Sequence, residues 1–308
     1  MERRAFVRAT AGLAGVAFTT PVDVAGLIPL PMGRARTRLA SGSRATAIVA
    51  FVKTRDRAAG VRRAVEMLEL NPARGKHLFL KPNFNSHHGG PGSTHNDTLA
   101  ALAEQLRAMG AGRITVGDRS GMGDTRRVME RKETFRMGEE LGFDTVVLDE
   151  LDDADWKVVN PPGSHWQRGF ALPRPVLEAD GVVQACCLKT HQFGGHFTLS
   201  LKNSVGLAAK RVPGDSWDYM KELHGSSDQR RMIAEITEVA LDAVGVAILR
   251  YFGTTPEVSR GTIFEQEQIA RAVELGLGVG SPEEIELVTN DAESRAYADR
   301  IREVLLET

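Results

Sequence analysis

The chain is poor in cysteine and in aromatic residues. Its 308 residues include two cysteines, Cys186 and Cys187, which are adjacent. Neighbouring residues of a strand point to opposite faces, so we do not expect a disulfide between them. Because there is no Cys-x-x-Cys cluster, this chain alone cannot hold an iron–sulfur cluster. Aromatic residues make up 6% of the sequence, too few for a surface that stacks nucleic-acid bases.

The chain also has no excess of charge of either sign. It contains 39 Lys and Arg residues against 40 Asp and Glu, a net charge of −1. A general nucleic-acid-binding protein needs a basic surplus, so nucleic acid is not expected as a partner. The length suits one large α/β domain or two modest ones.

A long uninterrupted hydrophobic run is also missing. The apolar N-terminal stretch from Ala9 to Pro31 is broken by Pro21, Asp23 and Pro29. A bilayer-spanning helix needs about 20 predominantly apolar residues, so no stable transmembrane span is expected there.

Residues 1–43 have the composition of a targeting segment. Arg3-Arg4-Ala5-Phe6-Val7-Arg8 resembles a twin-arginine signal, with Val and Arg where Leu and Lys are usual, and weakly apolar residues 9–18 follow. We therefore predict export by the twin-arginine machinery to the periplasm or outside the cell, with an α/β domain over residues 44–308. A disordered basic tail is the alternative.

Strand-like and helix-like segments alternate along residues 44–308. Short apolar or β-branched runs predict strands at 47–53, 77–81, 114–116, 144–148, 182–188 and 285–288. Helical spacing of apolar residues predicts helices at 56–70, 97–109, 125–141, 199–209, 264–275 and 292–306. This alternation predicts one large α/β domain with a mostly parallel sheet and helices on both faces. The proline-rich residues 150–180 are expected to form a hairpin or a wrapping loop.

Several motifs resemble the domain of unknown function 362 family. Lys189-Thr190-His191 precedes Ser200-Leu201-Lys202-Asn203-Ser204-Val205-Gly206, the order of that family's signature. Further matching pieces are Lys81-Pro82-Asn83, Gly117-Asp118, and residues 242–247 and 268–278. The resemblance spans residues 48–288 and implies a single α/β domain. The family has no established activity, so the resemblance implies no reaction.

One departure from the family concerns residues 232–244. In the family, the regions that match 232–236 and 241–244 are separated by several tens of residues that include a strand. Here these regions nearly abut, so we predict one helix of about 20 residues or more from near Gln229 to Arg250. The sheet would then lack strand material, and a neighbouring edge would be less covered.

Histidines gather in two loops, each of which follows a predicted strand. Five of the eight lie there, namely His87, His88, His95, His191 and His196. Because parallel strands end at one edge of a sheet, these loops can converge. Imidazoles together with a carboxylate such as Asp118 suit zinc, iron or nickel, so one hypothesis is a divalent transition-metal site. Hydrogen-bonding histidines in plain polar loops are the alternative.

A second hypothesis uses the lysines. They stand at two strand ends and at a helix start, as Lys81, Lys189 and Lys202. Glycine-rich backbone beside a helix start offers N–H groups to an anion, and lysine adds charge. We therefore predict a phosphate or carboxylate ligand bound by Lys81, Asn83, Lys202 and Gly206, unless such residues only cap and solvate the helix. No phosphate-binding P-loop or Gly-x-Gly-x-x-Gly motif supports a nucleotide.

A third hypothesis is proton transfer. Lys189 or His191 would act as the base and Asn203 would orient the substrate. Cys187 lies within an apolar run and is better explained as a packed hydrophobe than as a nucleophile. Two classes of function therefore stay open: an enzyme-like exported protein with a small anionic or metal-linked ligand, or a non-catalytic binding protein or degenerate paralogue. The sequence does not indicate an oligomeric state.

Overall fold

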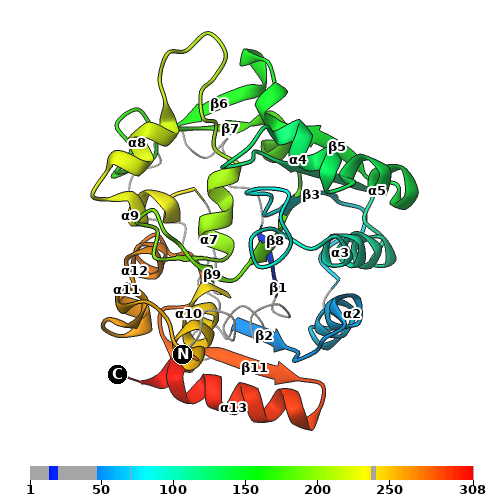
Figure 1. The fold of residues 1–308 in the computed structure, drawn as a ribbon, viewed down its shortest axis with the longest axis vertical. Coiled ribbons are helices and arrows are strands. Elements are labelled where there is room, and N and C mark those ends of the chain that lie inside the picture. The colour runs from blue at the N-terminus through cyan, green and yellow to red at the C-terminus, as the bar shows by residue number, and fades with distance from the viewer. Residues whose placement is uncertain (1–13, 20–46, 70, 237–240, 308) are drawn as a thin grey trace, which may run out of the picture.

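A five-stranded sheet forms the centre of the protein in a computed structural model (Figure 1). The structure describes residues 14–19, 47–69, 71–236 and 241–307. The strand order is β1-β8-β3-β4-β5. The parallel strands are β3 (His77–Pro82), β4 (Arg113–Asp118), β5 (Asp144–Val147) and β8 (Gly181–Cys187). The predicted α/β class with a mostly parallel sheet is confirmed.

Helices cover both faces of this sheet, and the side chains of β3 show why. Leu78 and Leu80 pack into a core with one group of helices, whereas Phe79 points into a core on the opposite face. The first face carries α2 (Arg57–Met67), α3 (Asn96–Ala108), α4 (Thr125–Arg131) and α5 (Thr134–Leu141). The second carries α7 (Ser200–Asn203), α8 (Tyr219–Gly225), α9 (Gln229–Ala234) and α12 (Glu267–Glu274).

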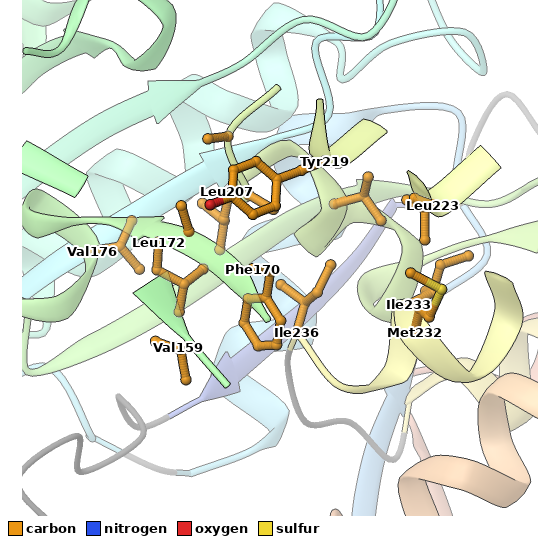
Figure 2. Close-up of a cluster of buried hydrophobic side chains, with 14 of the residues drawn as sticks. Val159, Phe170, Leu172, Val176, Leu207, Tyr219, Leu223, Met232, Ile233 and Ile236 are labelled. Atoms are coloured by element: carbon orange, nitrogen blue, oxygen red, sulfur yellow. The ribbon is translucent and has the colours of Figure 1, made fainter. Parts of the chain in front are cut away.

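The proline-rich segment 150–180 forms the predicted hairpin. Strands β6 (Trp156–Val159) and β7 (Phe170–Pro173) pair in antiparallel fashion, and the short helix α6 (Arg174–Leu177) follows. Figure 2 shows Phe170 and Leu172 of β7 in the same buried cluster as Tyr219 and Met232. The hairpin therefore extends the hydrophobic cover of the sheet face that bears α7.

The first and last predicted strands form a separate small sheet. Strand β2 (Ala47–Phe51) pairs in parallel with β11 (Ile285–Thr289). This pair packs with α10 (Leu241–Phe252) and α13 (Ala292–Leu306) in a third hydrophobic cluster. The strands themselves were predicted correctly, but their pairing was not, because periodicity does not specify a strand's partner.

Short elements complete the described chain. They are β9 (Lys189–Thr190), β10 (Phe197–Thr198), α11 (Pro256–Ser259) and 3₁₀ turns at Leu148–Glu150, Asp153–Asp155, Ser204–Gly206, Ile263–Glu265 and Pro282–Glu284. No helix in the described ranges has the length and apolar character that crossing a bilayer requires.

The edge of the main sheet is occupied by β1 (Ala14–Thr19), which runs antiparallel to β8. These six residues belong to the segment predicted to lie outside the domain. The structure differs there because an exposed strand edge offers unpaired N–H and C=O groups to any extended segment. The twin-arginine motif and the rest of residues 1–43 lie outside the described residues, so the export signal stays a prediction.

The prediction of one long helix from Gln229 to Arg250 is wrong. Helix α9 ends at Ala234 and α10 begins at Leu241, with residues 237–240 outside the described ranges. After α9 the chain tightens into a turn, in which Ile236 N–H donates to Ile233 at 3.4 Å. The Glu235 carboxylate in this turn is held by neighbouring segments, since it accepts hydrogen bonds from His165 and Arg271.

Two other predicted helices are shorter than expected. The segment 125–141 divides into α4 and α5 at Glu133, which adopts a left-handed conformation with φ of 54°. A non-glycine residue in this region interrupts a helix, and the sequence carries no signal for it. The segment predicted at 199–209 is helical only in α7 and continues as the 3₁₀ turn Ser204–Gly206.

The pairing of β1 with β8 predicts a change in hydrogen exchange. In a chain that starts at residue 44, the amides of β8 that face β1 should lose their partners and exchange about tenfold faster or more. Hydrogen–deuterium exchange of the full and shortened chains measures this directly. Strand β4 lies between β3 and β5 in both chains and serves as the control. Identical exchange of β8 in the two chains would contradict the pairing.

Candidate functional site

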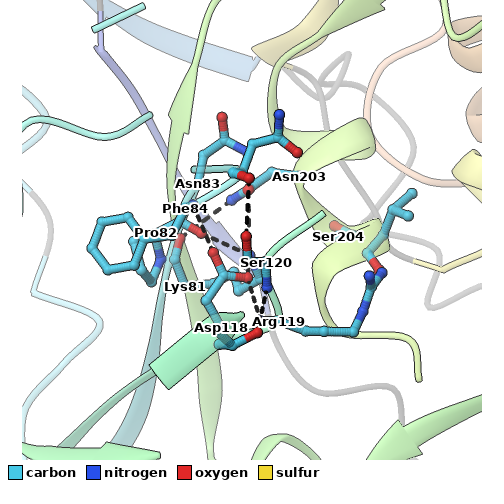
Figure 3. Close-up of polar contacts among 12 residues, drawn as sticks. Lys81, Pro82, Asn83, Phe84, Asp118, Arg119, Ser120, Asn203 and Ser204 are labelled. Carbon is cyan, nitrogen blue, oxygen red and sulfur yellow. Dashed lines mark hydrogen bonds and ion pairs between the residues drawn. The ribbon is translucent and has the colours of Figure 1, made fainter. Parts of the chain in front are cut away.

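A buried ion pair joins the carboxyl ends of β3 and β4. Lys81 Nζ lies 2.5 Å from Asp118 Oδ1, and the two side chains are only 1% and 2% exposed. Asp118 also accepts the backbone N–H groups of Phe84 and Arg119, each at 2.6 Å (Figure 3). Three donors therefore surround the carboxylate, and among the described residues it belongs to no group of three or more possible metal ligands.

The charges of this pair work against the effect of burial. Burial raises the pKa of Asp118, while the Lys81 ammonium and the two backbone N–H groups oppose that rise. Burial likewise lowers the pKa of Lys81, and the charge of Asp118 opposes this shift. The hydrogen bonds to Asp118 favour its ionised form, so we assign the pair as charged.

A buried amide connects the ion pair to α7. Asn203 Nδ2 donates to the Lys81 carbonyl at 3.2 Å and to Gln184 Oε1 at 2.6 Å, while its Oδ1 accepts from Lys81 Nζ at 3.4 Å. Gln184 in turn donates to Ser204 Oγ at 3.0 Å. Asn203 therefore holds β3, β8 and α7 together, and its amide is committed to this network and not to a substrate.

The start of α7 is fixed by Asp242 from α10. Its carboxylate accepts the Ser200 N–H at 3.0 Å, the Leu201 N–H at 3.2 Å and the Ser200 hydroxyl. Burial raises the pKa of Asp242 to about 6. Helix α7 is thus positioned by contacts at both ends, which also fixes the backbone of Lys202.

Gly206 allows the turn after α7 to approach the ion pair. A Cβ atom at this position would lie 2.7 Å from both Asp118 Oδ1 and Lys81 Nζ. Any side chain there would have to displace the pair. The structure therefore shows a packing role for Gly206, and its role in ligand binding stays a prediction.

Lys189 joins the two loops that the sequence predicted to converge. Its Nζ donates to Asn83 Oδ1 at 2.5 Å and to the carbonyls of Pro91 and Gly92 at 3.2 and 2.9 Å. These bonds use all three donors of the ammonium. The loops meet through this lysine and not through their imidazoles, so Lys189 clamps the loop at residues 83–92 and is not free to act as a base.

Lys202 differs from the other two lysines. It is half-buried, and within the described part of the chain no carboxylate or hydrogen-bond acceptor contacts its Nζ. Burial, followed by the positive charges of Arg119, Lys189 and Lys81, lowers the pKa of Lys202 to about 7. Both the amine and the ammonium are therefore populated near neutral pH.

His191 lies beside Lys202 in a defined protonation state. The Gly195 N–H donates to Nδ1 at 3.2 Å, which places the ring proton on Nε2. Burial, followed by the charge of Lys202, lowers the pKa of His191 to about 3, so the ring is neutral. A Cβ on Gly195 would lie 2.8 Å from His191 Nδ1 and 3.3 Å from Lys202 Cε, so both side chains pack on this glycine.

The structure does not gather the predicted metal ligands. These were His87, His88, His95, Asp118, His191 and His196. The rings of His87 and His88 stack on each other at the surface, and the His95 ring accepts the Asp97 N–H at the start of α3. Across the described ranges, no group of three or more His, Cys, Asp or Glu is placed to hold a metal ion. The hydrogen bonds of His95 and His191 fit the alternative, in which the histidines belong to polar loops.

Three buried polar residues of the site were not predicted. Gln184 is a lone polar residue in an apolar strand and Asp242 a lone carboxylate in an apolar helix, and this contrast is a signal that the sequence did carry. Arg119 follows Asp118 and donates to the carbonyls of Ala208 and Val205. No pattern in the sequence indicated the hydrogen bonds that Arg119 makes to these distant carbonyls.

The buried ion pair predicts a large loss of stability for Asp118→Asn. The change leaves the Lys81 charge buried without its partner, which costs about 3–5 kcal/mol. Urea unfolding followed by circular dichroism measures this loss. The control is Asp144→Asn, which breaks an exposed pair with Arg113 and should cost about 0–1 kcal/mol. Equal losses in the two variants would show that the pair does not stabilise the fold.

Comparison with known proteins identifies the family. The family model described as "Domain of unknown function (DUF362)" matches residues 78–272. This range includes every residue of the site, from Lys81 to Asp242. No curated protein and no solved structure matches the chain.

Proposed function

The chain belongs to the domain of unknown function (DUF362) family, and from the geometry of its site we propose that it binds a small carboxylate or phosphate compound at Lys202. One observation carries this proposal: Lys202 is a half-buried cation with cationic neighbours and, in the described ranges, no anionic partner. An unpaired charge in such a place is costly unless a ligand supplies the counter-charge.

The charges around Lys202 favour an anion over a neutral ligand. The charge of Lys81 is balanced by Asp118. Arg119 and Lys189, however, donate to neutral oxygens. The charge of Asp149 also acts on Arg119, but Asp149 forms an ion pair with Lys210. The site therefore retains a positive potential that a carboxylate or phosphate group would offset.

His191 adds a neutral donor to this site. Because Nδ1 is engaged by Gly195, the Nε2–H group is available for an oxygen of the ligand. An anion beside Lys202 would then accept one charged and one neutral hydrogen bond. Lys202 also exchanges its proton near neutral pH, which suits general acid–base catalysis and moves the proposed catalytic role from Lys189 to Lys202.

Anion binding should depend on pH through Lys202. A bound anion raises the lysine pKa above its free value of about 7, so affinity is full below pH 7 and falls above it, by up to about tenfold per pH unit. The affinity stops falling once the pH exceeds the pKa that Lys202 has in the complex. Calorimetric titration with sulfate and oxalate, whose charges are constant over about pH 6–9, measures this dependence.

Two variants test the assignment to Lys202. Lys202→Arg keeps a charge that does not titrate in this range, so it should bind the same anions with a flat pH profile. Lys202→Met should abolish binding, whereas Lys221→Met on the exposed face of α8 should leave it unchanged. A wild-type profile that is flat, or equal losses in the two Met variants, would contradict the proposal.

Export through the N-terminal segment is also part of the proposal, supported by Arg3 and Arg4. The twin-arginine machinery reads this pair as an address, so replacing both by Lys should retain the protein in the cytoplasm. Cell fractionation of the native host measures the exported share, which we expect to fall about tenfold or more. Arg8→Lys, outside the pair, is the control. An unchanged exported share in the double variant would rule this route out.

A further inference from the structure

Resting on the proposed anion site, we propose that Lys202 forms an imine with a small oxo acid, a compound that carries a ketone or aldehyde group close to its carboxylate. The proposal goes beyond binding, because it makes the Lys202 amine a nucleophile that bonds covalently to the ligand. It also narrows the ligand from anions in general to anions with a reactive carbonyl group.

The hydrogen bonds of the three lysines single out Lys202. Lys81 donates to Asp118, to the Pro82 carbonyl and to Asn203. Lys189 likewise donates to three oxygens. An ammonium with three acceptors has no lone pair to offer. Lys202 has none of these partners in the described ranges, so its nitrogen is free to lose a proton and attack a carbon.

The position of Lys202 is preorganised. Asp242 fixes the start of α7, and Asn203 holds the next residue in the buried network. The lysine backbone is therefore anchored, and the residue as a whole is only partly buried. A lysine that is held on a rigid element, partly desolvated and surrounded by cations is an arrangement that activates its amine for covalent catalysis.

The surrounding charge serves both functional groups of an oxo acid. Arg119, Lys189 and Lys81 favour the neutral amine of Lys202, the nucleophilic form. The same positive charges attract the carboxylate of the ligand. A neutral aldehyde or ketone would gain only from the first effect, so we expect the site to select carbonyl compounds that carry an anionic group.

The reaction conserves atoms and involves no oxidation. The Nζ lone pair attacks the carbonyl carbon, and the C=O π electrons move to the oxygen, which accepts a hydrogen bond from His191 Nε2–H. A proton passes from Nζ to this oxygen through solvent, giving a carbinolamine. Loss of the hydroxyl group with a second proton releases water, as the nitrogen lone pair forms the C=N bond.

Borohydride trapping tests the proposal. The full chain is incubated with pyruvate, treated with sodium borohydride and mapped by peptide mass spectrometry. Reduction converts the imine to a stable secondary amine, and we expect the adduct on Lys202 at about tenfold or more above the exposed Lys221. Sulfate should compete with pyruvate and lower the yield, and acetone, which has no carboxylate, should label Lys202 several-fold less.

The outcomes separate this inference from the proposed function. Sulfate binding without a Lys202 adduct would overturn the imine and leave the anion site standing. Failure of both would overturn both. Adducts spread evenly over surface lysines, or equal labelling by acetone and pyruvate, would also contradict the inference. Lys202→Arg should bind sulfate but give no adduct. Its sulfate binding would show that the variant is folded, so that the missing adduct reflects the missing amine.

Discussion

The buried ion pair between Lys81 and Asp118 is the interaction on which the rest of the site depends. Removing two charges from water costs several kcal/mol per ion, and the pair is retained because additional donors and acceptors surround it. Satisfying the pair brings Asn203 against β3 and Gly206 against the two charged groups. The position of α7, and with it the position of Lys202, follows from this requirement.

Lys81, Lys189 and Lys202 lie in one small region, and each of the three charges has a different environment. A carboxylate balances Lys81, whereas three neutral oxygens solvate Lys189. Within the described residues Lys202 receives neither, and the charges that act on it are those of Arg119, Lys189 and Lys81. Proteins tolerate such an unfavourable local arrangement mainly where function requires it, and this contrast is the physical basis of both proposals.

Much of the architecture was predictable because it follows local patterns. Apolar runs identified the four parallel strands of the main sheet but not β1, and helical spacing identified α13 with its bounds as observed. Partner choice was not predictable, since β2 pairs with β11 and β1 fills the edge of β8. The break at Glu133 was also hidden, because a left-handed non-glycine residue leaves no mark in the hydrophobic pattern.

The sequence by itself determined where the candidate site is. Lys81, Asp118 and Lys189 each stand where an apolar or β-branched run ends, and parallel strands must end at a common edge. Only the tertiary structure decided which lysine is free. The partners that occupy Lys81 and Lys189 lie up to 122 residues away along the chain, so competition for hydrogen bonds and charge is settled only once the strands and loops meet.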